Sequence, residues 1–441
     1  MAEKVYQTTT VWEETQKRLE FIFREFDNIC VAFSGGKDSG LVLNMVMEYA
    51  SEHKTTNHLA VFHQDFEAQY TETTNYVTST FRKLPEGVEK YWCCFPMMVE
   101  NSLSVYEPWW YTWDADKPEI WARSMPDEDG VYNLFKNPFP WYRMNMLEEE
   151  FHDEFTEWFA ETHSGKSVVL LGIRADESLM RYRSIAKKKW CYDGRKWTHK
   201  ITEKAYTASP IYDWQVEDVW TANGKRGYDY NRLYDLFYKA GVPLNSMRVA
   251  SPFLTEGRPW LNTYRIVDPV MWARLVGRVN GANFGAIYGT TKAVAYRDVK
   301  LPEGHTWESY TKFLLSTLPE ETRQNYEKIF RTSIDFWKKT GGGMPEESIQ
   351  EAKKLGYGFR ENGTSPYSKD HAKKRMVIDV IPDDTDDITS TTDFPSWKRM
   401  CMCILRNDYT CKTMGFAPTK EQQERINGIK AKYRSITRGG D

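Results

Sequence analysis

Apolar positions along the first half of the chain follow two spacings that alternate with each other. Short runs of strand-forming apolar residues cover residues 28–33, 59–63, 89–95 and 167–172. Helical spacing, with apolar residues three or four positions apart, covers residues 10–27, 39–50, 71–82 and 147–163. Strands that alternate with helices predict a doubly wound, mostly parallel α/β sheet. We expect about five strands in the order 3-2-1-4-5, with a ligand above the carboxyl ends of the first and fourth strands.

Helical spacing predominates after residue 245. Asp268 followed by Pro269 is a typical N-cap and first-turn pair, and it predicts a helix that runs to Val279. Pro319 and Pro345 open two further predicted helices. The pattern therefore predicts an α/β domain over residues 1–245 and a mainly helical region over residues 246–441.

Two long stretches interrupt this plan. Residues 96–145 are irregular and carry clusters of Trp and Pro, and such a length is typical of a substrate-facing insertion. Residues 357–395 are polar and include an acidic run at 383–387, which indicates a flexible stretch.

The composition is that of an ordinary globular protein, with 441 residues of which 41% are apolar and 27% charged. A net charge of −3 excludes a global electrostatic attraction to nucleic acid. The basic stretch from Arg174 to Lys200 nevertheless leaves a nucleic-acid partner open. No apolar run approaches the length of a membrane span, and the first residues lack the apolar core of a signal peptide. We therefore expect a cytoplasmic protein that does not enter a membrane.

The loop after the first predicted strand has the chemistry of a phosphate site. Its residues are Ser34, Gly35, Gly36, Lys37, Asp38 and Ser39. Glycines let the backbone approach a phosphate closely, and the start of the following helix supplies unpaired N–H groups and a positive dipole end. The loop is not a Walker A sequence, because Val31 and Asp38 stand where that pattern requires Gly and Ser or Thr.

The segment Ser34–Ser39 resembles the PP-loop of the ATP pyrophosphatase and PAPS reductase superfamily. Further segments extend the resemblance in the same order: Asp65 with Tyr70–Thr73, then Gly172–Ser178, then Pro210–Trp220 with Tyr230–Tyr234. The chain as a whole is similar to PAPS-reductase-like proteins of phages and prophages of the immunoglobulin-binding regulator A type. This resemblance implies an adenine nucleotide alpha hydrolase-like fold, an adenine nucleotide as ligand and a ParB-like protein as partner.

The resemblance also implies roles for individual residues. Besides the loop, it implies that the nucleotide is bound by Asp65, Arg174, Glu177 and Arg181. Lys37, Asp38 and Arg174 are the expected catalytic residues, and Asp38 is the expected ligand of Mg²⁺. Asp65 could instead cap its strand, and Arg174 could instead form a structural salt bridge with Glu177.

Three functions remain open on this basis. An ATP pyrophosphatase would release pyrophosphate and attach AMP to a substrate before sulfur or nitrogen is incorporated. A PAPS or APS reductase would bind its sulfonucleotide in the same loop, and a nucleotide-sensing regulator would use the pocket without catalysis. The sequence contains no CxxC, so we expect no four-thiolate iron–sulfur cluster. Cys401, Cys403 and Cys411 are either buried thiols or, with a fourth ligand, a zinc site.

Overall fold

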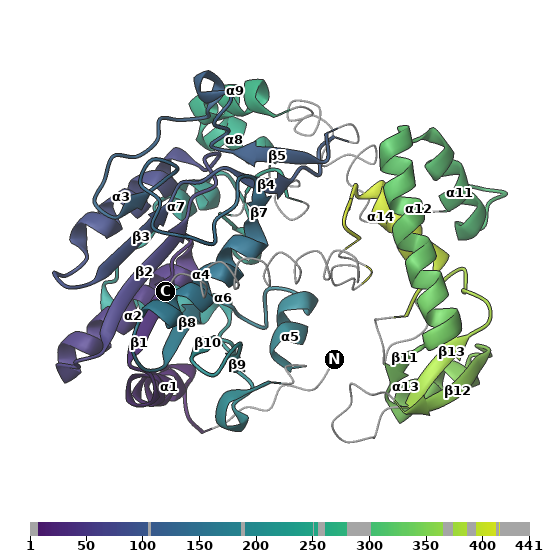
Figure 1. Ribbon diagram of the computed structural model, residues 1–441, viewed down its shortest axis with the longest axis horizontal. Coiled ribbons are helices and arrows are strands. Elements are labelled where there is room, and N and C mark those ends of the chain that lie inside the picture. Colours follow the sequence, from purple (N-terminus) through teal and green to yellow (C-terminus); the bar gives the residue numbers. More distant parts are fainter. Residues whose placement is uncertain are drawn as a thin grey trace, which may run out of the picture. The chain divides into compact units, whose positions relative to one another are not determined.

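The computed structural model describes residues 8–104, 107–186, 190–249, 251–254, 261–279, 301–364, 374–385, 394–411 and 414. The chain forms two compact units (Figure 1). The first comprises Met1–Val99, Trp110–Pro252 and Trp260–Val279, and the second comprises Glu100–Trp109, Phe253–Pro259 and Asn280–Asp441.

A seven-stranded sheet forms the centre of the first unit, in the order β6-β3-β2-β1-β8-β10-β9. The strands are β1 Asn28–Ala32, β2 His58–Gln64, β3 Glu89–Cys93, β6 Val131–Tyr132, β8 Ser167–Leu171, β9 Thr198–Lys200 and β10 Ala205–Ala208. All neighbouring pairs are parallel except β10 with β9. The inner strands β3-β2-β1-β8-β10 have the predicted order 3-2-1-4-5, which confirms the doubly wound fold. The edge strands β6 and β9 are additions to the predicted sheet.

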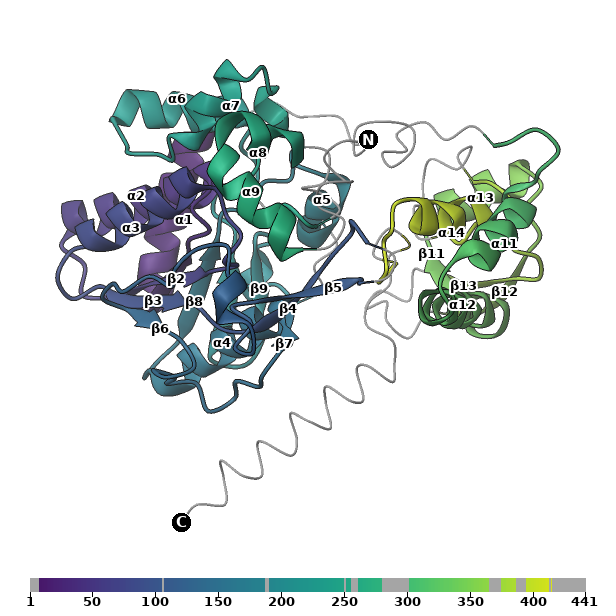
Figure 2. The same cartoon turned by 90° about the horizontal axis from the view of Figure 1, so that it is seen from above.

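Helices cover both faces of this sheet (Figure 2). One face packs against α1 Val11–Glu25, α2 Lys37–His53, α3 Thr71–Lys83 and α6 Val216–Arg226. The other face packs against α4 Glu148–Thr162, whose buried Phe151, Phe155 and Phe159 contact the layer formed by Cys30 and Ala60. Successive strand residues point to opposite faces, so the continuous apolar runs of the sequence are buried on both sides.

The predicted insertion, residues 96–145, contains short ordered elements. These are β4 Met97–Glu100, β5 Trp109–Thr112, η1 Pro118–Ile120 and the edge strand β6. Strands β5 and β4 join β7, Met146–Leu147, in a three-stranded sheet. Trp113 at the end of β5 is 1% exposed and donates from its Nε1 to the carbonyl oxygen of Asp65 at 3.0 Å, which ties the insertion to the end of β2.

The first unit extends beyond the predicted boundary at residue 245. After β8 it contains α5 Leu179–Ala186, η2 Tyr192–Gly194, α7 Leu233–Lys239 and η3 Leu244–Ser246, which crosses the predicted boundary. Beyond that boundary it contains α8 Leu261–Val267 and α9 Pro269–Arg278. Tyr264 stacks on Tyr70, with ring centroids 3.5 Å apart. Asp268 accepts from the N–H of Met271 at 3.1 Å, as the predicted N-cap, and from the N–H of Thr71 at 2.7 Å. One carboxylate therefore begins both α9 and α3, and these contacts place α8 and α9 in the first unit.

The second unit is less purely helical than predicted. It contains α11 Trp307–Thr317, α12 Glu320–Asp335, the π-helical η5 Phe336–Thr340, α13 Glu346–Lys354 and α14 Trp397–Leu405. An antiparallel sheet in the order β11-β13-β12 lies in the same unit, with β11 Gly342–Met344, β12 Phe359–Thr364 and β13 Lys374–Ile378. Strands β12 and β13 fall inside the stretch 357–395 that was expected to be flexible. They are ordered because Met376 and Ile378 are buried against Tyr326 and Met400.

No helix in the described parts of the chain combines the length and apolar character needed to cross a membrane.

Candidate functional site

The loop Ser34–Ser39 connects the carboxyl end of β1 to the first turn of α2. Two glycines let it pack closely against α3 and against the end of β8. Gly35 has φ +76°, and a Cβ there would lie 2.9 Å from Cγ2 of Thr73. A Cβ at Gly172, directly after β8, would lie 2.6 Å from the backbone nitrogen of Ser39. Both positions therefore require glycine, since any side chain would push the loop away from α3 or from β8.

Two serines close the loop on itself. The N–H of Ser34 donates to Oγ of Ser39 at 3.1 Å, and the two hydroxyl oxygens lie 3.0 Å apart. Gly36 is the N-cap of α2 and donates its N–H to Oγ of Ser34 at 3.3 Å. The hydroxyls expected to donate to phosphate thus also hold the loop in its curved shape.

Residues far along the chain support the loop from outside. The Asn231 amide donates to the carbonyl oxygen of Gly35 and to Oγ1 of Thr73, both at 2.9 Å. The phenol oxygen of Tyr234 accepts from the N–H of Lys37 at 3.0 Å. Burial, followed by the nearby Asp38 carboxylate, raises the pKa of Tyr234, so the phenol keeps its proton. Neither Asn231 nor Tyr234 was assigned a role from sequence, although both lie in the Tyr230–Tyr234 segment that carried part of the resemblance.

Two buried cations converge on one carboxylate beside the loop. Nζ of Lys37 lies 2.8 Å from Oδ2 of Asp38, and Nε of Arg174 lies 2.7 Å from Oδ1 of the same carboxylate. Lys37 is 5% exposed, Arg174 3% and Asp38 9%. Arg174 also contacts the more exposed Asp176 through NH1 at 3.3 Å, rather than forming the alternative salt bridge with Glu177. The three buried groups carry one excess positive charge at the start of a helix, which is where an anion is stabilised.

Several donors at this point have no partner among the described residues. NH2 of Arg174 makes no hydrogen bond to them, and neither do the backbone N–H groups of Asp38 and Ser39. Unpaired N–H groups in the first turn of a helix, next to a guanidinium, suit a bound phosphate. The loop, Lys37 and Arg174 are therefore brought together as the sequence predicted.

The expected Mg²⁺ ligand does not fit this arrangement. Both carboxylate oxygens of Asp38 face a cation, one from Lys37 and one from Arg174. A divalent ion at the same oxygens would be repelled by both side chains. Asp38 instead positions the two cations.

Asp65 makes its contacts away from the loop. Its carboxylate is fully buried and accepts from NH2 of Arg123 at 2.5 Å, from Nε1 of Trp92 at 2.7 Å and from the N–H of Glu67 at 2.9 Å. Burial favours a higher pKa, but Arg123 and the other partners outweigh it and hold the pKa of Asp65 below its ordinary value. These contacts match the alternative interpretation, in which Asp65 anchors the end of its strand.

Glu67 extends the same network. Its carboxylate accepts from Nε of Arg278 at 2.9 Å, from the N–H of Ala122 at 2.7 Å and from the N–H of Trp113 at 2.6 Å. Glu67 is fully buried, and Arg278 is 5% exposed in its side chain. We name Asp65, Glu67, Arg123 and Arg278 the anchor cluster, because it joins β2, the insertion and α9.

Glu177 and Arg181 lie next to the site and pair with each other. Nε of Arg181 is 3.4 Å from Oε2 of Glu177, and the Arg181 side chain is 44% exposed. Neither side chain hydrogen-bonds to loop residues 34–39 in the described structure, so their nucleotide contacts remain a prediction.

The cysteines are less available to bind a metal, and the basic stretch is less available to bind a nucleic acid, than the sequence suggested. None of the seven cysteines forms a disulfide. A hydrogen bond with Cys403, together with burial, raises the pKa of Cys411 well above its ordinary value, so it is a thiol at neutral pH. In the basic stretch, Arg195 pairs with Asp193 and Lys200 pairs with Glu203, while residues 187–189 lie outside the described structure.

The chain is similar to other proteins along its length and in part of its fold. It is 32% identical over 441 residues to the uncharacterized protein YbdN of Escherichia coli (strain K12), covering 98% of this chain and 97% of that protein. A family described as a domain of unknown function (DUF3440) matches residues 241–425. Among solved structures, the phosphate complex of a PAPS reductase from Candida auris has 13% identity and a TM-score of 0.28, over 53% of this chain and 94% of that chain. The U34-tRNA thiolase NcsA of Methanococcus maripaludis, with its [4Fe-4S] cluster, has 12% identity and a TM-score of 0.28, over 62% of this chain and 80% of that chain. Likenesses at these scores assign no activity.

Proposed function

We propose a function for this chain, which belongs to the same family as YbdN of Escherichia coli, from the geometry of its own site. It is a PP-loop enzyme that cleaves ATP to AMP and pyrophosphate. The observation that carries this proposal is the pair of buried cations, Lys37 and Arg174, held by Asp38 at the first turn of α2. A glycine-rich loop and unpaired helix N–H groups complete a site for a polyphosphate.

The proposed step transfers AMP to a substrate oxygen. That oxygen attacks the α-phosphorus, the bond to the bridging oxygen of the β-phosphate breaks, and pyrophosphate leaves with the electron pair. The proton of the attacking group passes to solvent. Negative charge accumulates on the leaving pyrophosphate, and Lys37 and Arg174 would stabilise it in a site that is already organised before reaction. The protein contributes positioning and charge neutralisation rather than a nucleophile.

A sulfonucleotide reductase is the second candidate, and the state of Cys411 argues against it. A thiol-dependent reductase needs a reactive thiolate, because the thiolate and not the thiol is the nucleophile. Cys411 is buried and its pKa is raised. This favours the pyrophosphatase, and binding without turnover would identify the nucleotide-sensing regulator instead.

The three functions are separated by their products. The full chain is incubated with ATP, APS or PAPS, the last two with reduced thioredoxin, and pyrophosphate and sulfite are measured. Pyrophosphate from ATP that disappears in Lys37→Ala supports the proposal. Sulfite from PAPS that disappears in Cys411→Ser would establish the reductase in its place. Nucleotide retention without either product would indicate a regulator.

A further inference from the structure

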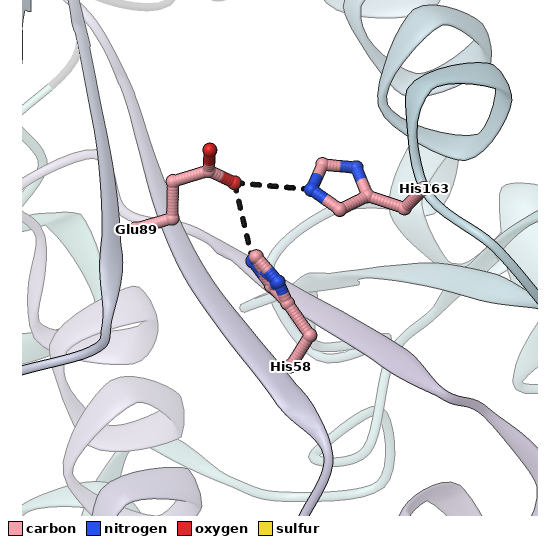
Figure 3. Close-up of side chains that lie close together, drawn as sticks. All are labelled: His58, Glu89 and His163. Carbon is pink, nitrogen blue, oxygen red and sulfur yellow. Dashed lines mark ion pairs between the residues drawn. The ribbon is translucent and has the colours of Figure 1, made fainter.

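Two histidines and a glutamate meet at the edge of the sheet opposite the phosphate loop (Figure 3). His58 begins β2, Glu89 begins β3, and His163 follows the last residue of α4. The loop Ser34–Ser39 lies at the carboxyl ends of the parallel strands, so this cluster lies at their amino ends. The proposed chemistry uses none of the three residues.

The spacing of the three side chains matches that of metal ligands. Nε2 of His58 and Nε2 of His163 each lie 3.2 Å from Oε2 of Glu89. One ligand atom from each residue lies within 4.8 Å of the other two. Tetrahedral zinc with bonds of about 2.0–2.1 Å separates its ligand atoms by about 3.3 Å, which is close to the observed distances. We propose that His58, Glu89 and His163 bind a Zn²⁺-class transition-metal ion, with the fourth position left to water.

Hydrogen bonding fixes the direction in which His163 offers its lone pair. Nδ1 of His163 lies 2.8 Å from the carbonyl oxygen of Phe159, which can only accept. Nδ1 therefore carries the proton, and in the neutral ring the lone pair of Nε2 points at the Glu89 carboxylate (Figure 3). A backbone carbonyl behind a histidine is the usual second partner of a metal-binding imidazole.

Two of the facing atoms are available as ligands. Within the described residues, Nε2 of His58 and Oε2 of Glu89 are buried and have no hydrogen-bond partner. A metal ion bound to both atoms would supply a positive charge between the carboxylate and the imidazole nitrogens that face it.

The surroundings of the cluster hold the three side chains in place near solvent. The side chains are 30% exposed for His58, 38% for Glu89 and 18% for His163, so the cluster borders solvent although Nε2 of His58 and Oε2 of Glu89 are themselves buried. The His58 and His163 rings meet edge to face with centroids 4.5 Å apart, which fixes their orientation. Two imidazoles and one carboxylate suit Zn²⁺ and its neighbours rather than Mg²⁺ or Ca²⁺, which prefer oxygen ligands.

The test uses the full chain after treatment with a chelator, with Zn²⁺ alone as the probe. Isothermal titration should give one Zn²⁺ per chain, and Glu89→Gln and His163→Ala should each weaken binding at least about tenfold. His53→Ala is the matched control, because His53 also lies at a helix end and bonds the carbonyl oxygen of Tyr49 at 3.0 Å, outside the cluster. That variant should bind Zn²⁺ like the wild type.

A second measurement does not depend on the variants folding. One equivalent of Co²⁺ added to the wild type should give the visible absorption of a tetrahedral site, and Zn²⁺ should displace it. No such absorption, or Zn²⁺ affinity that is unchanged in a Glu89→Gln, His163→Ala double variant, would overturn the proposal.

Discussion

The phosphate loop and the anchor cluster both bury two cationic side chains near the carboxyl edge of the sheet, but with one carboxylate in the loop and two in the cluster. In the loop, Asp38 is shared by Lys37 and Arg174, and several N–H donors have no partner among the described residues. In the anchor cluster, each carboxylate has its own arginine and also accepts backbone N–H groups. The comparison indicates that incomplete pairing, rather than burial of charge, marks the binding site.

The two arrangements should therefore respond differently to substitution. Removing a member of the anchor cluster leaves a buried charge without its counter-charge, so it should lower the free energy of unfolding. Removing a cation from the loop weakens the attraction for a bound phosphate, so it should lower the affinity for the nucleotide.

Glu67→Gln should lower the free energy of unfolding by about 3–5 kcal/mol, since Arg278 then remains buried without its counter-charge. Urea denaturation followed by tryptophan fluorescence measures this change. Glu86→Gln, at an exposed glutamate, is the control and should have little effect. Equal stability of the two variants would show that the anchor cluster does not stabilise the fold.

Lys37→Ala should weaken ATP binding by about 1.5–3 kcal/mol, the usual contribution of a hydrogen bond to a charged group, while the melting temperature changes little. Isothermal titration calorimetry measures the affinity. Lys17→Ala removes a lysine whose side chain is 62% exposed and serves as the control. Unchanged ATP affinity in Lys37→Ala would contradict the assignment of the loop.

Arg174→Lys should keep the charge but still weaken ATP binding on the order of tenfold, or about 1.4 kcal/mol. A lysine ammonium cannot hold Asp38 through one arm and face the ligand with the other, as the planar guanidinium can. Full affinity in this variant would reduce Arg174 to a generic positive charge. The loss should be smaller than in Arg174→Ala, which removes the charge as well.

Asp65 predicts a small dependence of stability on acid pH. Its folded pKa is below its ordinary value, so its contribution to stability is complete above about pH 4. That contribution is lost as the pH falls through the lower folded value, by at most about 1.4 kcal/mol per pH unit. The melting temperature of the wild type should therefore fall more steeply below about pH 4 than that of Asp65→Asn. Parallel curves would show that Asp65 keeps an ordinary pKa.

The sequence predicted those features that follow from the alternation of strands and helices. Apolar runs buried on both faces indicated a parallel, doubly wound sheet, and the loop follows from glycines between a strand and a helix. Arg174 at the end of β8 was also placed correctly beside the loop, because parallel strands bring their carboxyl ends together.

The rest depends on partners that lie far away in the chain. The sequence left open whether Asp65 binds the nucleotide or caps its strand, because its partner Arg123 comes from an insertion without a regular pattern. Tyr234 contacts Lys37 across 197 positions, and no periodicity connects the two. Strand β13 lies within a polar stretch, where a short apolar segment around Met376 is visible only once its packing partners are known.

The double role of Asp268 also has a consequence for the order in which the protein is completed during synthesis. The N–H of Thr71 at the start of α3 is bonded by a carboxylate 197 positions further along the chain. Helix α3 carries Thr73, which accepts from the same Asn231 amide that holds the Gly35 carbonyl. When the ribosome has made only the α/β half, Asp268 has not yet been synthesised, so the N–H at the start of α3 still lacks this acceptor. The nucleotide loop reaches its full set of supports only after Asp268 has emerged, late in translation, so an early-released chain should bind ATP poorly even if its central sheet has formed.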